Sequence, residues 1–215
     1  MSYSLNEVEA HSKRAARGAG LDWGLAEEAA KATRWICAQG LDGCRVLANL
    51  LDVYQTNPQK LGSPLSLTGE WHGSADLLCP VRTGASLSDS AQRVTADGVE
   101  IRDLSSPLII LPFVAAVARR TNTCLQVTWA DAIITTDGKT HKQQFATDMA
   151  AYVEQVDCMA IAHATALTDG AKSTHRATPS SQVWETLNSL AALTYAPATE
   201  TSRRLGAGAG QSDND

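Results

Sequence analysis

The spacing of the hydrophobic residues changes near residue 56, and this change constrains the fold more than any other feature. Before it, hydrophobic residues recur every three or four positions, as on one face of a helix. The clearest such set is Leu25, Ala29, Ala32 and Ile36. After it, hydrophobic and polar residues alternate, as in a strand with one buried face, beginning with Leu65, Leu67 and Trp71. We therefore expect a helical unit followed by a sheet, which is the α+β class.

Three helices are expected in the first part of the chain, up to residue 55. Ser4 and Glu7 have the spacing of a capping box, which marks the start of a helix, and glycines follow that end it. Asp22 and Asp42 are suited to cap a second and a third helix. The buried side of the third helix is expected to carry Leu47, Leu50, Leu51 and Tyr54.

The rest of the chain is expected to hold a mostly antiparallel sheet with flanking helices. Alternating segments predict strands at 65–73, 98–104 and 124–129. Asp137 and Gly138 predict a two-residue hairpin turn. Residues 156–164 fit a strand or a buried helix, because a short apolar run has no distinguishing period. A last helix is expected over 179–193, with Val183, Leu187 and Leu190 on its buried face.

These elements divide the chain into three parts: a helical unit at 1–55, an α+β core at 56–201 and a glycine-rich tail at 202–215. The formal net charge of −5 provides no overall positive field that would attract nucleic acid or an anionic membrane. The five cysteines are scattered without the close pairs of a zinc site or a redox motif. No secretory leader or membrane-spanning stretch is recognisable. We expect a cytoplasmic protein with reduced cysteines, no bound metal and no cofactor.

The tail contains Gly206, Gly208 and Gly210, which resemble half of a dinucleotide-binding motif. That motif requires a strand before it and a helix after it, and the residues that follow here are acidic and few. A phosphate-binding loop is therefore excluded. The tail is either a frayed end or a docking arm. In the second case Arg203, Arg204, Asp213 and Asp215 would carry its charges.

Five residues are candidate acid–base groups. Glu27 and Glu28 begin the second helix, where they either line a pocket or complement the helix dipole on the surface. Glu70 and His72 share one side of an expected strand, either as an oriented carboxylate–imidazole pair or as its solvated face. Asp131 follows a strand, where it could also cap or bulge the chain. Trp23 and Trp129 are candidates for the wall of a pocket.

The remaining histidines form no metal-binding or catalytic motif. His141 and His175 lie in polar surroundings and are expected to be exposed. His163 lies in an apolar alternation and is expected to be a hydrogen-bonded core residue. Cys79 precedes a proline between apolar residues and is interpreted as structural.

A DNA-binding function would use the basic side of the first helix. Lys13, Arg14 and Arg17 lie on that helix, and short helices follow it, as in a helix-turn-helix protein. The later helices bring carboxylates such as Glu27 and Glu28, so the region lacks a coherent basic recognition face. We keep a DNA-binding regulator only as the weakest of three hypotheses.

Two stretches of the chain together resemble a known family. They are "YSLNEVEAHSKRAARGAGLDWGLAEEAAKATRWICAQG" at residues 3–40 and "SRRLGAGAGQSDND" at residues 202–215. This combination is similar to a bacterial family catalogued only as a domain of unknown function. The resemblance implies a bacterial cytoplasmic protein whose tail belongs to the family pattern, and it supplies no reaction, cofactor or site residue.

The leading hypothesis from the sequence is an accessory or binding subunit in bacterial small-molecule metabolism. It would contact a protein partner, or a second copy of itself, through the helical unit and the tail. The alternative is a cofactor-independent enzyme that acts on a small polar substrate through the acid–base candidates named above. The two hypotheses differ in what the structure should contain, since an enzyme needs several of those groups in one pocket.

Overall fold

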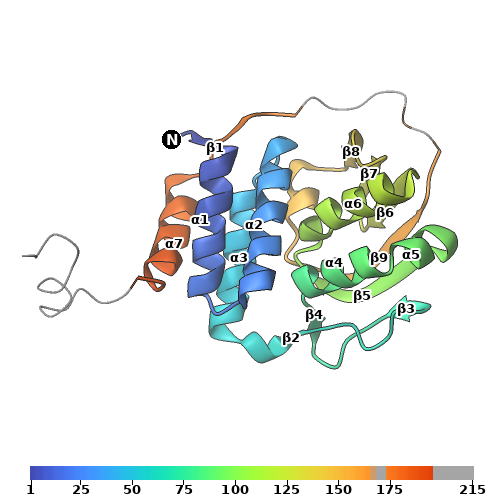
Figure 1. Cartoon of the computed structure of the whole chain (residues 1–215), viewed down its shortest axis with the longest axis horizontal. Helices are drawn as coiled ribbons and strands as arrows, with labels where there is room; N and C mark the ends of the chain where they lie inside the picture. The colour runs from blue at the N-terminus through green and yellow to red at the C-terminus, as the bar shows by residue number, and fades with distance from the viewer. Residues whose placement is uncertain (166, 168–172, 196–215) are drawn as a thin grey trace, which may run out of the picture.

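A computed structural model describes residues 1–165, 167 and 173–195 of the chain. A layer of four helices lies beside a sheet that carries three further helices on one face (Figure 1). The predicted α+β class is therefore confirmed. The described residues include no helix of the length and hydrophobicity that crossing a membrane requires.

Four helices form the bundle, and they are α1 (Leu5–Gly18), α2 (Trp23–Ala38), α3 (Gly43–Thr56) and α7 (Ser181–Ala192). The capping box that begins α1 is present in full, because Ser4 and Glu7 each bond the other's backbone N–H. The expected buried face of α2 is confirmed apart from the partly buried Leu25, and α3 buries its whole predicted set. The last helix, α7, packs against α1 and α3 and so lies with the N-terminal helices rather than with the sheet.

A short antiparallel pair of strands joins the two ends of the described chain. β1 (Tyr3–Ser4) precedes α1 and pairs with β10 (Arg176–Ala177), which precedes α7. Beside this pair, the ring of Trp184 is stacked between Tyr3 and His11, with centroid distances of 3.7 and 4.4 Å. This stack fixes the start of α7 against α1.

The sheet has the strand order β2-β4-β5-β9-β6-β7-β8, and β3 also pairs with β5. The strands are β2 (Leu61–Gly62), β3 (Glu70–Trp71), β4 (Leu77–Leu78), β5 (Val99–Ser105), β6 (Leu125–Trp129), β7 (Ala132–Thr136), β8 (His141–Phe145) and β9 (Gln155–His163). The pairs β2–β4, β3–β5 and β4–β5 are parallel, and the five longer strands pair antiparallel with one another. The ambiguous segment 156–164 is thus a strand, β9, which fills the place between β5 and β6.

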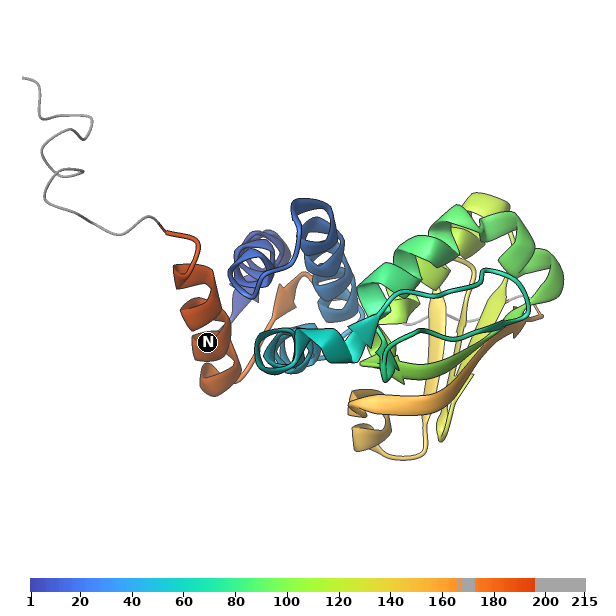
Figure 2. The ribbon, with the colours of Figure 1, turned by 90° about the horizontal axis from the view of Figure 1, so that it is seen from below.

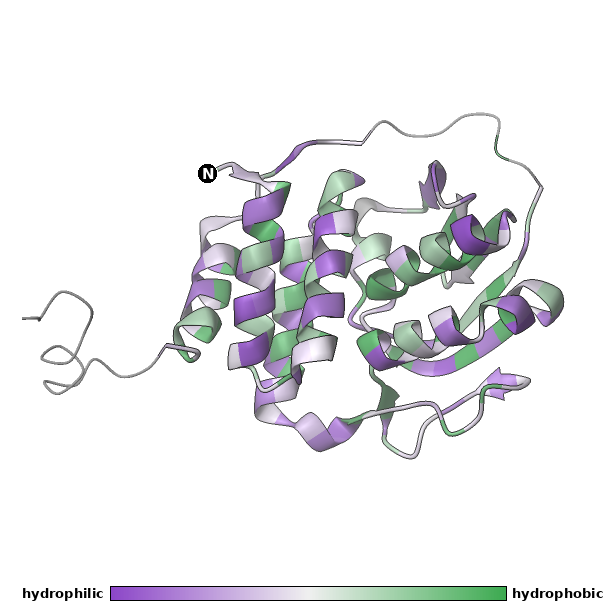
Figure 3. Ribbon diagram, in the orientation of Figure 1, coloured by the Kyte–Doolittle hydropathy of each residue, from purple (hydrophilic) through white to green (hydrophobic). Residues whose placement is uncertain are grey.

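Helices α4 (Pro80–Asp89), α5 (Ala91–Asp97) and α6 (Leu111–Thr121) lie over one face of the sheet (Figure 2). A 3₁₀ turn, η2 (Pro107–Ile110), leads from β5 into α6, and another, η3 (Asp148–Tyr152), leads into β9. A third, η1 (Pro58–Lys60), follows α3. One continuous hydrophobic core extends from the bundle into the sheet layer, because α2 contacts α4, α6 and η2. In Figure 3 the outward side of α1 is largely hydrophilic, whereas β4 is hydrophobic throughout.

The strand expected over residues 65–73 is wrong for most of its length. Only Glu70 and Trp71 form a strand, and Leu65 is 64% exposed. The chain turns at Gly69, where φ is +66°, and meets β5 for two residues only. The Leu65 N–H instead donates to the His72 carbonyl at 3.0 Å, so the segment folds back on itself and only two of its residues pair with β5.

The expected hairpin at Asp137–Gly138 has a four-residue loop rather than a two-residue turn. Thr136 pairs with His141, and the Asp137 carboxylate accepts hydrogen bonds from the backbone N–H groups of Lys139 and Thr140. The two-residue turn lies instead between β6 and β7, at Ala130 and Asp131.

Two histidine predictions are also wrong. His141 is 4% exposed and lies beside Trp35, with 5.9 Å between the ring centroids. Burial lowers its pKa, because the charged imidazolium is poorly solvated there. His163 is exposed, because it is the last residue of β9 and lies beyond the apolar part of that strand. His175 is exposed as expected.

Candidate functional site

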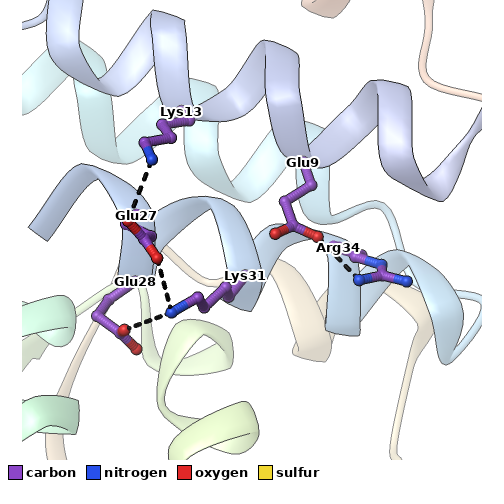
Figure 4. Close-up of polar contacts among 6 residues, drawn as sticks. All are labelled: Glu9, Lys13, Glu27, Glu28, Lys31 and Arg34. Carbon is purple, nitrogen blue, oxygen red and sulfur yellow. Dashed lines mark hydrogen bonds and ion pairs between the residues drawn. The ribbon is translucent and has the colours of Figure 1, made fainter. Parts of the chain in front are cut away.

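The acid–base candidates of α2 lie in an ion-pair network on the outer surface of α1 and α2 (Figure 4). Glu27 contacts both Lys13 and Lys31 at 3.1 Å, and Glu28 contacts Lys31 at 3.1 Å. The hydrogen bonds from Lys13 and Lys31 lower the pKa of Glu27, so its carboxyl group stays ionised. A second pair, Arg34 with Glu9 at 2.9 Å, joins the same two helices. Glu27 and Glu9 connect α2 and α1, whereas Glu28 pairs only within α2, and none of the three lines the two pockets described below.

The other acid–base candidates are distributed over separate places. The Glu70 carboxylate accepts a hydrogen bond of 2.7 Å from the Arg102 guanidinium on β5. His72 is exposed beyond the end of β3, and no bond between it and Glu70 is present in the described part of the chain. Asp131 is exposed in the turn between β6 and β7. The structure therefore does not bring the five candidates into one site.

The two candidate wall residues have opposite environments. Trp23 is 67% exposed at the start of α2, with the Arg17 guanidinium 4.5 Å from its ring centroid. Trp129 is 2% exposed, and its indole N–H donates to the Ala150 carbonyl at 3.3 Å. Neither side chain lines either of the two pockets described below. The tail candidates, which are Arg203, Arg204, Gly206, Gly208, Gly210, Asp213 and Asp215, lie outside the described residues.

A different site lies where the bundle meets the sheet, and we call it the junction pocket. It has a volume of about 600 Å³ and is formed by α3, the end of β5, the residue before β9 and the start of α7. Its lining is polar except for three aliphatic residues. It consists of Asp42, Arg45, Ala48, Asn49, Asp52, Val53, Ser105, Ser106, Glu154, Ser180, Gln182, Val183 and Thr186. The volume lies in the range of small-molecule sites, about 300–1,000 Å³, and the lining is more polar than is usual in such sites.

The floor of the junction pocket is a pair of buried serines at the end of β5. Ser105 and Ser106 are 2% and 3% exposed, and their hydroxyl oxygens lie 3.5 Å apart. Ser106 has φ +45° and ψ +61°, the left-handed conformation that serine rarely adopts. Its backbone N–H donates to the Glu154 carbonyl at 2.7 Å, which holds the strained residue in place. Strained residues of this kind concentrate at ligand-binding and catalytic sites.

The α3 wall carries charged residues of both signs. Arg45 places its guanidinium 5.0 Å from the centroid of the Tyr152 ring, a cation–π contact. The Tyr152 hydroxyl accepts a hydrogen bond of 3.0 Å from the backbone N–H of Asp42, the residue that caps α3. Within the described chain, neither Arg45 nor the lining carboxylates of Asp42, Asp52 and Glu154 take part in a salt bridge.

A smaller pocket of about 250 Å³ lies on the other side of Asp42 and Tyr152. Its lining includes Cys37, whose thiol lies at the first turn of α3. A hydrogen bond from the Cys44 thiol, assisted by backbone N–H groups of that turn, lowers the pKa of Cys37. All five cysteines are free thiols, as expected. Among the described residues no cluster of three or more potential metal ligands occurs.

Sequence reasoning missed the residues of the junction pocket, although two signals for them were present. Asp42, Arg45, Asn49 and Asp52 are polar residues at helical spacing, opposite the buried face of α3. The "SSP" segment at 105–107 follows a strand and precedes a helix, which is where ligands often meet a sheet. Neither signal shows by itself that the two segments lie close together.

Residues 3–106 match the model of a family described as "Protein of unknown function (DUF3726)". The expected resemblance to a family of unknown function is thereby confirmed. The matched residues include α3 and the Ser105–Ser106 pair, whereas Glu154, α7 and the tail lie beyond the match. No curated protein matches the chain.

Among solved structures, one described as sulfolactate dehydrogenase from Methanocaldococcus jannaschii aligns with a TM-score of 0.48 and 11% sequence identity. The alignment covers 67% of this chain and 51% of that enzyme, so the chain spans about half the length of its structural neighbour. A likeness at this level indicates neither an activity nor a substrate for the chain.

Proposed function

We propose that this protein is an accessory or binding protein of small-molecule metabolism that holds a small polar molecule in the junction pocket. The observation that carries the proposal is the pair of buried hydroxyls at the strained end of β5, beneath a wall of charged residues. A backbone strain of this kind costs on the order of 1–3 kcal/mol, and it persists where the surrounding structure holds the residue, most often at a functional site. The proposed function of this strained residue is to place a hydroxyl group against a bound ligand.

Binding without catalysis fits the chemistry of the lining better than an enzyme does. Within the described chain the lining holds no histidine, lysine or cysteine, so Ser105 and Ser106 lack the usual activating base. The acid–base candidates on α2, β3 and the β6–β7 turn are apart from one another and from this pocket. The pocket instead offers donors, acceptors and charges that orient a molecule.

The end of the bundle supports the part of this proposal that concerns a protein partner. Trp23, Leu193 and Tyr195 are each more than 60% exposed, at 67%, 62% and 62%. Arg17 stacks on Trp23, and Arg14 donates to the Tyr195 hydroxyl at 3.3 Å. Trp, Tyr and Arg side chains dominate binding energy at protein interfaces, so this end of the bundle is the proposed partner surface.

Binding in the pocket can be tested with a metabolite library and a variant that removes the strain. Ser106→Gly accepts a positive φ without cost, so it should leave stability unchanged or raise it, while it removes a hydroxyl from the floor. The shift in unfolding temperature that a library compound gives the wild type should shrink in this variant. Asn122→Gly is the matched control, because Asn122 has φ +53° but lies at the end of α6, outside the pocket. Equal ligand shifts in all three proteins, or no shift with any compound, would contradict the proposal.

The partner surface needs a separate experiment. Affinity capture from the native host should retain a stoichiometric partner with the wild type and with Ile133→Ala, a control at another exposed apolar residue. The same partner should be lost with Trp23→Ala. Retention by Trp23→Ala would exclude this end of the bundle as the contact.

A further inference from the structure

We infer that Cys37 and Cys44 form a peroxide-reactive site, at which hydrogen peroxide enters the pocket lined by Cys37 and converts the two thiols into a disulfide bond. Neither cysteine lines the junction pocket, and the inference does not depend on the ligand proposed there. It rests on three observations: the two thiols meet between two helices, the Cys37 sulfur lies against the first turn of α3, and Cys37 lines a separate pocket.

The fold brings the two cysteines together where α2 ends and α3 begins. Cys37 is the next-to-last residue of α2, and Cys44 is the second residue of α3. The Cys44 thiol donates a hydrogen bond to the Cys37 sulfur. Two cysteines whose side chains point apart cannot form a disulfide without movement of the backbone, so this contact is the first requirement for the reaction.

Gly43 allows the Cys37 sulfur to approach the backbone of α3. A Cβ atom at Gly43 would lie 3.1 Å from Cys37 Sγ, so the sulfur lies directly against the first turn of that helix. Backbone N–H groups at the start of a helix stabilise a negative charge. The Cys44 thiol, together with the backbone N–H groups of Gly43 and Cys44, therefore lowers the pKa of Cys37 in spite of its burial.

The two thiols have different roles. Their hydrogen bond, together with burial, raises the pKa of Cys44, so Cys44 keeps its proton and Cys37 is the thiolate that attacks. Once the Cys37 sulfur has been oxidised, it no longer carries the negative charge that holds this proton. Cys44 is then free to act as the second thiol, which closes the disulfide.

The reaction has two steps. In the first, the Cys37 sulfur bonds to one oxygen of the peroxide, the O–O bond breaks, and the other oxygen leaves as water with the proton that the Cys37 thiol released. In the second, the Cys44 sulfur bonds to the Cys37 sulfur, the S–O bond of the sulfenic acid breaks, and the hydroxyl group leaves as water with the proton of Cys44. The two thiols lose two electrons, and the peroxide gains them.

Access to the site restricts the oxidant to a small molecule. Cys37 is 3% exposed and Cys44 is 0% exposed, and a buried cysteine without access behaves as a small hydrophobic residue. The pocket beside Cys37 has a volume of about 250 Å³, which is enough for hydrogen peroxide. Tyr152 and Thr178 line the same pocket, and their hydroxyl groups can donate a hydrogen bond to the oxygen that leaves.

The other three cysteines provide an internal comparison. Cys79 is buried, and its sulfur lies 2.9 Å from the Tyr54 hydroxyl. Cys124 and Cys158 are more exposed than Cys37, but burial of its thiol raises the pKa of Cys124. Exposure alone predicts that Cys124 and Cys158 react first with peroxide, whereas the contacts described above predict that Cys37 does.

The test is to oxidise the reduced full chain with hydrogen peroxide, alkylate the remaining thiols in denaturant, and map the cysteines by peptide mass spectrometry. The wild type should form the disulfide between Cys37 and Cys44, and the Cys37 thiol should be lost about tenfold faster than that of Cys158. Cys44→Ser keeps a donor beside Cys37 but has no second thiol, so oxidation should stop at a sulfenic acid on Cys37, which dimedone traps.

Two variants serve as controls. Cys37→Ser should form no disulfide, and Cys158→Ser should react as the wild type does. Unfolding temperatures show whether each variant is folded, and the wild-type map stands without them. Oxidation of Cys124 or Cys158 before Cys37, or a disulfide between any other pair, would overturn the inference. So would the recovery of five free thiols at a peroxide concentration that fully oxidises dithiothreitol.

Discussion

Substitution of Gly18 by alanine should destabilise the protein, although glycine to alanine in a helix ordinarily stabilises it. Gly18 is the last residue of α1, where α7 crosses closely. A Cβ atom at this position would overlap the Leu190 carbonyl oxygen and lie 2.7 Å from the carbonyl carbon. Both atoms belong to the backbone of α7, so the overlap can be relieved only by moving that helix.

The magnitude follows from two opposing contributions. Replacement of a helical glycine by alanine gains up to about 1 kcal/mol. Overpacking a close contact costs about 1–3 kcal/mol, and the upper part of this range applies because no flexible side chain can yield. We expect a net loss of about 2 kcal/mol, which is roughly 4–8 °C in the unfolding temperature of a chain of this size. Gly24→Ala is the matched control, because a Cβ there would meet nothing within 4 Å and should gain up to about 1 kcal/mol.

Urea unfolding of both variants measures these free energies, and amide hydrogen exchange locates the effect. In Gly18→Ala, exchange should accelerate selectively in α7, since that helix must shift, and it should stay unchanged in α5. A Gly18→Ala protein as stable as Gly24→Ala would refute the close packing of α1 on α7, and with it the place of α7 beside the N-terminal helices.

Three further predictions concern other parts of the core. Burial lowers the pKa of His11 and His141 below the ordinary value of 6.5, so the unfolded state takes up protons first as the pH falls. The free energy of unfolding should therefore have its full value above about pH 6.5 and fall below that pH. In the His11→Gln, His141→Gln double variant, the free energy of unfolding should depend less steeply on pH in this range. Gly84→Ala should cost about 1–3 kcal/mol in urea unfolding, because its Cβ would lie 2.5 Å from Cγ of Phe113, and an unchanged midpoint would contradict the packing of α4 on α6. Tyr152→Phe keeps the ring beside the Arg45 guanidinium but loses the bond to the first turn of α3, so it should cost about 1 kcal/mol in urea unfolding, and an unchanged midpoint would contradict that bond.

The four helices of the bundle could be predicted from the sequence because their signals are local, whereas α4, α5 and α6 were expected only as helices that flank the sheet. The Ser4–Glu7 capping box and the apolar stripe of α3 each lie within a few residues of the structure that they determine. The short strands β2, β3 and β4 could not be predicted in the same way. Each is two residues long and exists only because a distant strand pairs with it. Leu65 and Leu67 alternate as a strand would, yet they find no such partner.

The junction pocket could not be predicted from the sequence either, because it too depends on segments that are distant in the chain. Its walls come from α3, the end of β5, Glu154 and the start of α7, which lie far apart in the sequence. Acid–base candidates were chosen instead from pairs that are close in sequence, such as Glu70 with His72. Residues that are close in the sequence usually lie on the same helix or strand, whereas the residues that line a pocket come from several helices and strands. The positive φ of Ser106 could not be predicted from the sequence either, because the residue is held by a backbone bond to Glu154, which is distant in the chain.

A ligand that spans the junction pocket should couple the bundle to the sheet, since its two walls belong to different layers. Ser105, Ser106 and Glu154 belong to the sheet layer, and α3 and α7 belong to the bundle. A ligand at a hundred times its dissociation constant stabilises the native state by about 2.7 kcal/mol. With a library compound that stabilises the wild type at that concentration, amide exchange should slow in the first turn of α7 and around Ser106 together, and it should not change in α5. Slower exchange confined to α3 would mean that the compound binds the surface of that helix alone and does not bridge the layers.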